Sequence, residues 1–387
     1  MSTPTDRATT PGGGRGRAIA RETLRRRRPR RGRLTTAVLA SALLALAACT
    51  SQGEPEPAPS TTASAAPSVS LPGKPVPQPL PARWPLTGVA GEIQERPALS
   101  VKVENSAAAR PQTGLEDADV VWEELVEGGI TRFNAVYHSV VPGEVGPIRS
   151  VRPMDAAIAA PLGGLMAFSG GQVPFVQQIR DAGLQVLSND EGVAGMYRVG
   201  FRRAPHNVYG SGPDLLAQAD ADHSAPPPQQ LVYAWHPARA SAVLKGTLVS
   251  VVDVSFPRTA PGWTWDGAAD PGRGGPAGAW VRDDNGVVQT SAAGARLLAT
   301  NVVVLRVQVV DTGSRDPAGN PVPETVLTGE GDAVVASGGK VLEARWSKAA
   351  TADPVVLTDP DGGQVTLVPG TTWIELVPVN GGAVSWQ

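Results

Sequence analysis

The chain has 387 residues, of which 41% are hydrophobic and 18% are charged, with a formal net charge of −2. This length suffices for two ordinary domains, and the composition excludes a chain that is disordered throughout. Gly and Pro make up about a fifth of the residues, which indicates a linker and many tight turns and argues against a long helical bundle.

The first 48 residues are strongly basic. They contain eleven Arg and two acidic residues, a net charge of +9, whereas the rest of the chain carries −11. An uncharged, apolar stretch over residues 34–48 follows the arginines, as in the n-region and h-region of a signal peptide. As a helix this stretch would cover only about 22 Å, so a signal peptide is favoured over an anchor helix. The basic run is therefore interpreted as a topology signal, and no nucleic-acid partner is predicted.

The apolar stretch ends in Leu46-Ala47-Ala48-Cys49, which resembles the lipobox of bacterial lipoproteins, and Cys49 is the only cysteine of the chain. We predict a signal peptide over 1–48 and lipidation of Cys49, by palmitate among other acyl chains. A signal peptide with a chance cysteine is the alternative. The prediction places the protein on the outer face of the bacterial cytoplasmic membrane, anchored by lipid. Residues 49–83 are rich in Pro, Ser and Ala and predict an extended tether.

An α/β domain is predicted over residues 84–228. Residues 97–104 alternate as a strand, and residues 119–126 and 130–138 read as two further strands. Gly128 and Gly129 between the latter two are a strong signal for a two-residue hairpin. A helix over 116–127 competes with this interpretation because Glu-rich runs favour helix.

Pairing Glu127 with Ile130 fixes the predicted register of this hairpin. The expected core face then carries Val120, Trp122, Glu124, Val126, Thr131, Phe133, Ala135 and Tyr137.

Helical and strand patterns alternate beyond the hairpin, which predicts a partly parallel, mixed sheet. The predicted elements are a loop over 143–151, helices over 154–160, 174–182 and 213–222, and strands over 165–169 and 184–187.

Polar residues that fit neither solvent nor turn roles gather in five segments of this domain. The segments are residues 109–114, 123–132, 146–153, 168–171 and 198–207. They combine several Arg with carboxylates, one His and glycines. Arg pairs bidentately with phosphate or carboxylate, and glycine lets a backbone N–H approach closely, so the mixture suits an anion site.

In four of these segments, and in two stretches beyond residue 300, the chain resembles the YerB-like bacterial lipoprotein family, a family of two domains of unknown function. The matching stretches are ARPQTGL at 109–115, ELVEGGITRF at 124–133, GPIRSVR at 146–152, APHN at 204–207, NVVV at 301–304 and PGTTW at 369–373. The resemblance covers residues 84–387. It implies lipid anchoring and two domains, and it brings no established activity or catalytic residue.

The candidate ligand-binding residues come from these five segments. They are Arg110, Glu124, Arg132, Arg149, Ser150, Arg152, Ser169, Arg203, His206 and Asn207. Each has a structural alternative: Arg149 and Arg152 could form ion pairs within the fold, and His206 could serve packing or hydrogen bonding. Glu124 is expected either to pair with an Arg or to have a raised pKa.

Ser169 follows a predicted strand, where a nucleophile or an anion-binding turn would lie, but it lacks the first glycine of a G-x-S-x-G elbow. The four histidines are scattered and show no metal-ligand spacing, and no phosphate-binding loop motif is present. No metal and no cofactor is predicted.

Residues 229–387 predict a β-rich second domain. Its expected strands are 247–256, 263–266, 279–282, 287–290, 301–310, 324–327, 333–337, 340–346, 355–358, 364–367 and 372–377. The run over 301–310 is the most apolar and is predicted as a central strand. Trp263, Trp265, Trp280, Trp346 and Trp373 could form a carbohydrate-stacking platform, but packing in a β core is the favoured interpretation.

Three functions remain open. The favoured one is a tethered extracytoplasmic protein that binds an anionic envelope ligand through Arg132, Arg149, Arg152 and Arg203. The second is an envelope phosphoryl or glycosyl-phosphate transferase or hydrolase, with Glu124 or His206 as acid-base. The third is a scaffold that binds an envelope protein. An enzyme is the less favoured interpretation.

Overall fold

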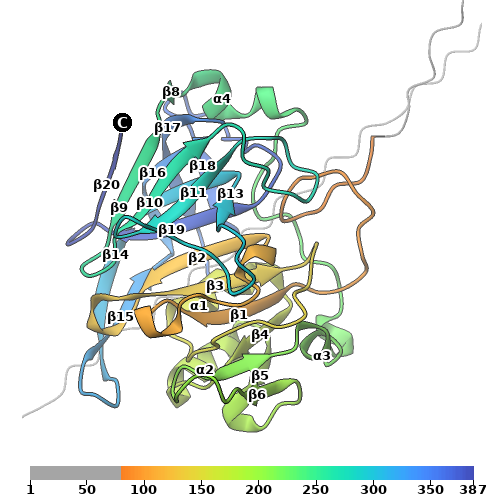
Figure 1. Ribbon diagram of the computed structural model, residues 1–387, viewed down its shortest axis with the longest axis vertical. Helices are drawn as coiled ribbons and strands as arrows, with labels where there is room; N and C mark the ends of the chain where they lie inside the picture. The colour runs from red at the N-terminus through yellow and green to blue at the C-terminus, as the bar shows by residue number, and fades with distance from the viewer. Residues whose placement is uncertain (1–79) are drawn as a thin grey trace, which may run out of the picture. The chain divides into compact units, whose positions relative to one another are not determined.

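Strands from both halves of the chain form one mixed sheet (Figure 1). The computed structural model describes residues 80–387, which lie in one compact unit; the predicted signal peptide and Cys49 fall outside them. Within the described residues this sheet has twelve strands, in the order β18-β17-β16-β14-β19-β2-β3-β1-β4-β5, with β15 on β14 and β8 on β17. The predicted fold class, a mixed sheet with helices followed by a β-rich part, is confirmed.

The first half supplies five strands of this sheet and three α-helices. Its elements are β1 (Leu99–Glu104), β2 (Val120–Leu125), β3 (Thr131–Tyr137), α1 (Met154–Ala159), β4 (Leu165–Phe168), α2 (Val173–Asp181), β5 (Gln185–Ser188), β6 (Met196–Arg198), β7 (Val208–Gly210) and α3 (Gly212–Leu216). β6 and β7 form a separate two-stranded sheet that the sequence pattern did not predict. The helix expected over 213–222 ends at Leu216, followed by a 3-10 turn at Ala221–His223.

The second half supplies the remaining strands of the large sheet and a smaller sheet in the order β12-β11-β10-β9-β20, with β13 on β11. Its elements are α4 (Ser241–Lys245), β8 (Thr247–Leu248), β9 (Val251–Ser255), β10 (Pro261–Asp266), β11 (Ala279–Asp284), β12 (Val287–Val288), β13 (Leu298–Ala299), β14 (Asn301–Arg315), β15 (Pro321–Val326), β16 (Gly329–Ser337), β17 (Lys340–Lys348), β18 (Val356–Thr358), β19 (Thr372–Pro378) and β20 (Ala383–Trp386).

Two expected strands of this half differ from the structure. The strand predicted over 247–256 is divided because β8 pairs with β17 in the large sheet, whereas β9 pairs with β10 in the smaller one. The segment 364–367 makes only isolated bridges from Gln364 and Leu367 and is not a strand.

The two halves of the chain join along β19. This strand lies between β14 and β2 and runs parallel to both, so that Trp373 is opposite Val302 on one side and Val121 on the other. The strands before and after the expected domain boundary near residue 228 therefore belong to one continuous sheet, and the boundary itself stays a prediction. The apolar run that begins at Asn301 is a central strand, as predicted, because β14 has β16 and β19 as its neighbours.

Hydrophobic side chains fill the space on both faces of the large sheet. One core lies between it and the smaller sheet and includes Phe133, Trp263 and Trp373. The other includes Trp122 of β2 and Ile158 of α1. Trp263, Trp280, Trp346 and Trp373 are at most 3% exposed, which confirms their interpretation as core residues. Trp265, the fifth tryptophan of that prediction, is only partly buried and packs against the first core.

The predicted pairing of β2 with β3 is wrong by one residue. Glu124 is opposite Arg132, and the backbone N–H of Val126 donates to the carbonyl of Ile130 at 2.9 Å. The loop is thus the three-residue turn Glu127–Gly129, in which both glycines have positive φ. Every residue of β2 and β3 is buried, so alternation of polarity could not determine the register.

The shift changes which side chains share a face of the sheet, because cross-strand partners point the same way. Glu124 shares its face with Arg132 and Asn134, while Phe133 lies on the opposite face beside Glu123. Charged side chains therefore occur on both faces of β2.

Candidate functional site

Several strands of the first half run in the same direction, so their carboxyl-terminal ends lie together along one side of the large sheet. β1, β4 and β5 are parallel, and β1 and β2 run in the same direction because both are antiparallel to β3. In open α/β sheets, ligands bind outside the carboxyl ends of the strands. The loops that follow β1, β2 and β4 on this side contain three of the five predicted motif segments.

The structure brings all five segments into contact. The backbones of Thr113 and Gly146 exchange hydrogen bonds of 2.8 and 3.2 Å, and the N–H of Ser169 donates to the carbonyl of Arg149 at 3.0 Å. Further bonds join the remaining segments: Arg202 Nη2 to Pro111 O at 2.7 Å, Arg149 Nη1 to Pro205 O at 3.3 Å, and Arg132 Nη1 to Ser150 O at 2.9 Å.

Arg132, Arg149 and Arg152 form what we call the arginine cluster. Arg152 is 7% exposed and is held by both carboxylate oxygens of Glu127, with Nη2 2.7 Å from Oε2. Arg132 is 6% exposed, and its Nη2 lies 3.8 Å from the same carboxylate. Burial, and after it the charges of Arg152 and Arg149, lower the pKa of Arg132 to about 9. Positive charge is therefore crowded around this guanidinium.

A fully buried ion-pair network lies beside the arginine cluster. Lys102 on β1 contacts the carboxylate of Glu124, and its Nζ is 2.9 Å from Asp155 Oδ1 at the start of α1. Asn134 donates to the same Asp155 oxygen at 2.9 Å. Burial lowers the pKa of Lys102 to about 8. The expected partner of Glu124, an Arg, is wrong: the partner is Lys102, which β1 places on the same face of the sheet.

The partly exposed side of the site contains Glu104, Arg149 and His206. Arg149 Nε lies 3.4 Å from Glu104 Oε2, and the Arg149 side chain is 20% exposed. His206 Nδ1 lies 2.8 Å from the Glu104 carboxylate, and its ring is 28% exposed. Ser106 Oγ also donates to Glu104, at 2.7 Å. His206 therefore makes a hydrogen bond within the fold, which is the structural alternative given for it above, and its ring is still partly exposed to solvent.

The other candidate residues lie around this group or away from it. Arg110 is apart, because it pairs with Asp284 of the smaller sheet and donates to Asn105 at 3.0 Å. Asn207 accepts a hydrogen bond from Arg198 at 2.7 Å. Arg203 is exposed, and within residues 80–387 its side chain has no hydrogen bond or ion pair.

The backbone near Ser169 is tightly packed. A Cβ at Gly170 would lie 1.9 Å from a carboxylate oxygen of Asp190, so a larger residue there would require the Asp190 side chain to move.

Sequence reasoning missed several members of the site. They are Lys102, Glu104, Glu127, Asn134 and Asp155. For Lys102 and Glu104 a signal was present: polar residues at every second position of an apolar strand indicate one polar face. The partners of these side chains on that face can be identified only in the tertiary structure, in which α1 lies over the face.

A second buried charge group lies on the opposite face of the sheet. Arg282 of β11, 1% exposed, donates to Glu123 of β2 at 2.7 Å and lies 3.5 Å from Glu375 of β19. Trp263 Nε1 donates to Glu375 at 3.0 Å. Burial, and after it the charge of Glu123, raises the pKa of Glu375 well above its ordinary value.

Two further observations apply to residues 80–387. None of their helices combines the length and the apolar character needed to cross a membrane. In the same part of the chain, no three His, Cys, Asp or Glu side chains are grouped as metal ligands would be. The site is therefore described by its ion pairs and hydrogen bonds alone.

Comparison with known proteins identifies the family. Residues 86–225 match the N-terminal domain, and residues 252–374 the C-terminal domain, of the family described as "Protein of unknown function (DUF3048)". A Bacillus subtilis (strain 168) protein named "Putative lipoprotein YerB" is 26% identical over 311 residues, which cover 76% of this chain and 86% of that protein. The crystal structure of the YerB protein from Bacillus subtilis has the same fold, with a TM-score of 0.64 at 24% identity over 79% of this chain and 99% of that one. The chain therefore belongs to the YerB-like DUF3048 family, and it contains both of the family's domains.

Proposed function

We propose that this protein is a lipoprotein anchored through Cys49 to the outer face of the bacterial membrane, and that it binds an anionic envelope ligand at the arginine cluster. The name of the Bacillus subtilis relative supports the lipid anchor. So does the order of basic run, apolar stretch and Cys49 in the sequence. Several acyl chains on one cysteine would hold the protein stably at the membrane.

The main support for the ligand proposal is that three guanidinium groups lie close together near the carboxyl-terminal ends of the strands. Arg132 is buried, and its Nε has no hydrogen-bond partner among residues 80–387. Burial, and after it the charges of the neighbouring arginines, lower its pKa. An anion bound beside these groups would relieve their mutual repulsion. Arg149 is the exposed member of the cluster, and it offers the route by which an anion would reach it.

The test is the thermal midpoint of the full chain in detergent, followed by tryptophan fluorescence, with pyrophosphate or a lipid-linked sugar phosphate added. All nine tryptophans lie beyond residue 83, so the signal reports on the described part of the chain. A ligand at 100 times its dissociation constant stabilises the folded state by about 2.7 kcal/mol. We expect a rise in the midpoint with at least one of these anions.

The variant Arg149→Ala should abolish that rise when it is compared with its own midpoint without ligand, which it can lower because its partner Glu104 is buried. Arg345→Ala is the matched control, since Arg345 is an exposed arginine of β17 that pairs with Asp332 at 2.9 Å. If neither anion shifts the midpoint, the anion site is rejected and a scaffold function takes its place.

A catalytic alternative is favoured by one observation, the contact of the partly exposed His206 with Glu104. A carboxylate that orients a histidine is a common arrangement for general acid-base catalysis. Glu124, the other expected acid-base residue, is fully buried against Lys102 and has no access to solvent. Turnover of a sugar phosphate that requires a divalent metal and disappears in His206→Ala would establish an enzyme.

The lipid anchor has its own test. Cys49→Ser should move the protein from the membrane fraction to the soluble fraction and should prevent incorporation of labelled palmitate. If the variant stays in the membrane fraction at the level of the natural chain, anchoring through Cys49 is wrong. This outcome would leave the ligand proposal unaffected, because Cys49 is not part of the arginine cluster.

A further inference from the structure

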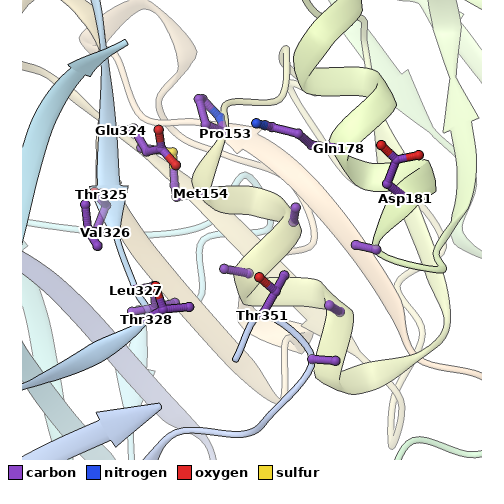
Figure 2. A pocket seen from close by; sticks show the side chains of 15 residues that line it. Pro153, Met154, Gln178, Asp181, Glu324, Thr325, Val326, Leu327, Thr328 and Thr351 are labelled. Carbon is purple, nitrogen blue, oxygen red and sulfur yellow. The ribbon is translucent and has the colours of Figure 1, made fainter. Parts of the chain in front are cut away.

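A cavity of about 420 Å³ lies over α1, between α2 and β15 (Figure 2). Its volume falls within the range of small-molecule sites, roughly 300–1,000 Å³. α1 and α2 belong to the first half of the chain and β15 to the second, so the cavity is lined by both halves. None of the candidate residues derived from the sequence lines it.

The floor of the cavity is apolar and made of small side chains. α1 contributes Met154, Ala156 and Ala157, and Ala160 follows the helix; Leu327 adds to the floor after the end of β15. Because these alanines are short, they leave room for a ligand as thick as an alkyl chain. Burial of the methylene groups of a ligand against this apolar floor would favour binding, because it removes apolar surface from water.

Carboxylates stand on opposite sides of this floor. Glu324 comes from β15 and Asp181 from the end of α2, and Figure 2 shows them on either side of α1. Asp181 accepts one hydrogen bond, from Gln177 at 2.8 Å. Among residues 80–387, Glu324 has no hydrogen bond or ion pair through its side chain. Both carboxylates can therefore take a further cationic partner.

No lysine or arginine is among the described residues that line the cavity. The ammonium of Lys348 is close to one border, but it is buried and donates to the carbonyl oxygens of Thr351, at 2.9 Å, and Asp353. The described side chains that line the cavity thus include two carboxylates and no basic group, which favours a cationic ligand over an anionic one.

We propose that this cavity binds a linear diamine or polyamine. Its methylene chain would lie on the alanine floor, and its two ammonium groups would each pair with a carboxylate, one with Glu324 and the other with Asp181. The proposal is independent of the anion site, because the two sites share no residue and require ligands of opposite charge.

The experiment is a titration of the full chain in detergent with 1,5-diaminopentane, spermidine, pentylamine and 1,5-pentanediol. Methyl NMR of ¹³C-labelled alanine reports on the floor directly through Ala156, Ala157 and Ala160. We expect saturable shifts of these methyl signals with the diamine or spermidine, weaker binding of pentylamine, and none of the uncharged diol. Added salt should weaken the binding, because the carboxylates are partly solvent-exposed.

The variants Glu324→Gln and Asp181→Asn should each weaken the diamine about threefold to fivefold, the effect of losing one partly exposed ion pair. The same variants should weaken the binding of pentylamine less than the binding of the diamine. Ala157→Leu fills the floor without changing a charge, keeps a good helix former, and should abolish binding. Glu330→Gln, which removes an exposed carboxylate on β16, is the control and should bind as the natural chain does.

The proposal is overturned if the alanine methyls do not shift with either amine. It is also overturned if pentylamine and 1,5-pentanediol bind as tightly as the diamine, because the two carboxylates would then play no part. The proposal is overturned as well if Glu324→Gln and the control Glu330→Gln bind the diamine with equal affinity. None of these results bears on the arginine cluster, whose test uses anions and Arg149.

Discussion

Lys102 shows how much one residue can depend on its neighbours. Its side chain is wholly buried, a position that costs free energy for an ammonium unless partners compensate the charge. Glu124 and Asp155 provide this compensation, and each of them is also fully buried. Removing one partner of such a group leaves an uncompensated buried charge, which is far more costly than the group itself is favourable.

We therefore expect Lys102→Met to lower the free energy of unfolding by about 3–5 kcal/mol, because two buried carboxylates lose their cation. Urea denaturation followed by tryptophan fluorescence measures this loss. Lys245→Met is the matched control: Lys245 also pairs with two carboxylates, Asp359 and Asp361, but it is exposed, so its loss should be much smaller. Adding Glu124→Gln to Lys102→Met should recover part of the stability. Equal losses in the two lysine variants would contradict this account.

At the scale of elements, the parallel pair of β2 and β19 places two carboxyl groups side by side. Glu123 and Glu375 are register partners, and both are fully buried. Glu123 accepts hydrogen bonds from Arg282 at 2.7 Å, Thr131 at 2.6 Å and Asn105 at 3.1 Å. Of the pair, Glu375 is the member whose pKa is raised well above its ordinary value, by burial first and then by the charge of Glu123.

The pH dependence of stability follows from the raised pKa of Glu375. In the unfolded chain this carboxyl ionises near its ordinary pKa of 4.5, whereas in the folded chain it stays protonated to higher pH. The folded state then binds more protons, so this contribution to stability falls as pH rises above 4.5. Gln resembles the protonated carboxyl. The free energy of unfolding of Glu375→Gln, relative to that of the natural chain, should therefore increase by up to about 1.4 kcal/mol for each unit by which the pH rises.

Urea denaturation at several values between about pH 5 and about pH 8 measures this difference. Glu123→Gln is the control, because it removes the charge that Arg282 needs, and it should be destabilised throughout this range. A constant difference between Glu375→Gln and the natural chain over the range would mean that Glu375 is ionised in the folded protein.

At the scale of the whole molecule, the two family domains share one sheet. β19 covers the edge of β2, and the core between the sheets combines Phe133 of the first half with Trp263 and Trp373 of the second. Arg273 adds a link by donating to the carbonyl of Ala118 at 2.9 Å. Neither half alone would satisfy the backbone hydrogen bonds along this seam, so the stability of the fold belongs to both halves together.

The sequence by itself determined the features that local patterns control. The α1 and α2 helices, the central strand that begins at Asn301 and the burial of Trp263, Trp280, Trp346 and Trp373 follow from apolar periodicity and propensity. Stretches within four of the five polar segments, together with two stretches beyond residue 300, also identified the family, and the structure brings the five segments together.

Tertiary structure alone decided what depends on contacts far apart in the chain. The pairing of β19 with β2 joins residue 372 to residue 120, and no pattern within either strand specifies that neighbour. The register of β2 and β3 was equally hidden, because a strand buried on both faces does not reveal which side chains share a face. The strand pattern marked Lys102 as a polar position, but its pairing with Glu124 and Asp155 became visible only once β1, β2 and α1 were placed beside one another.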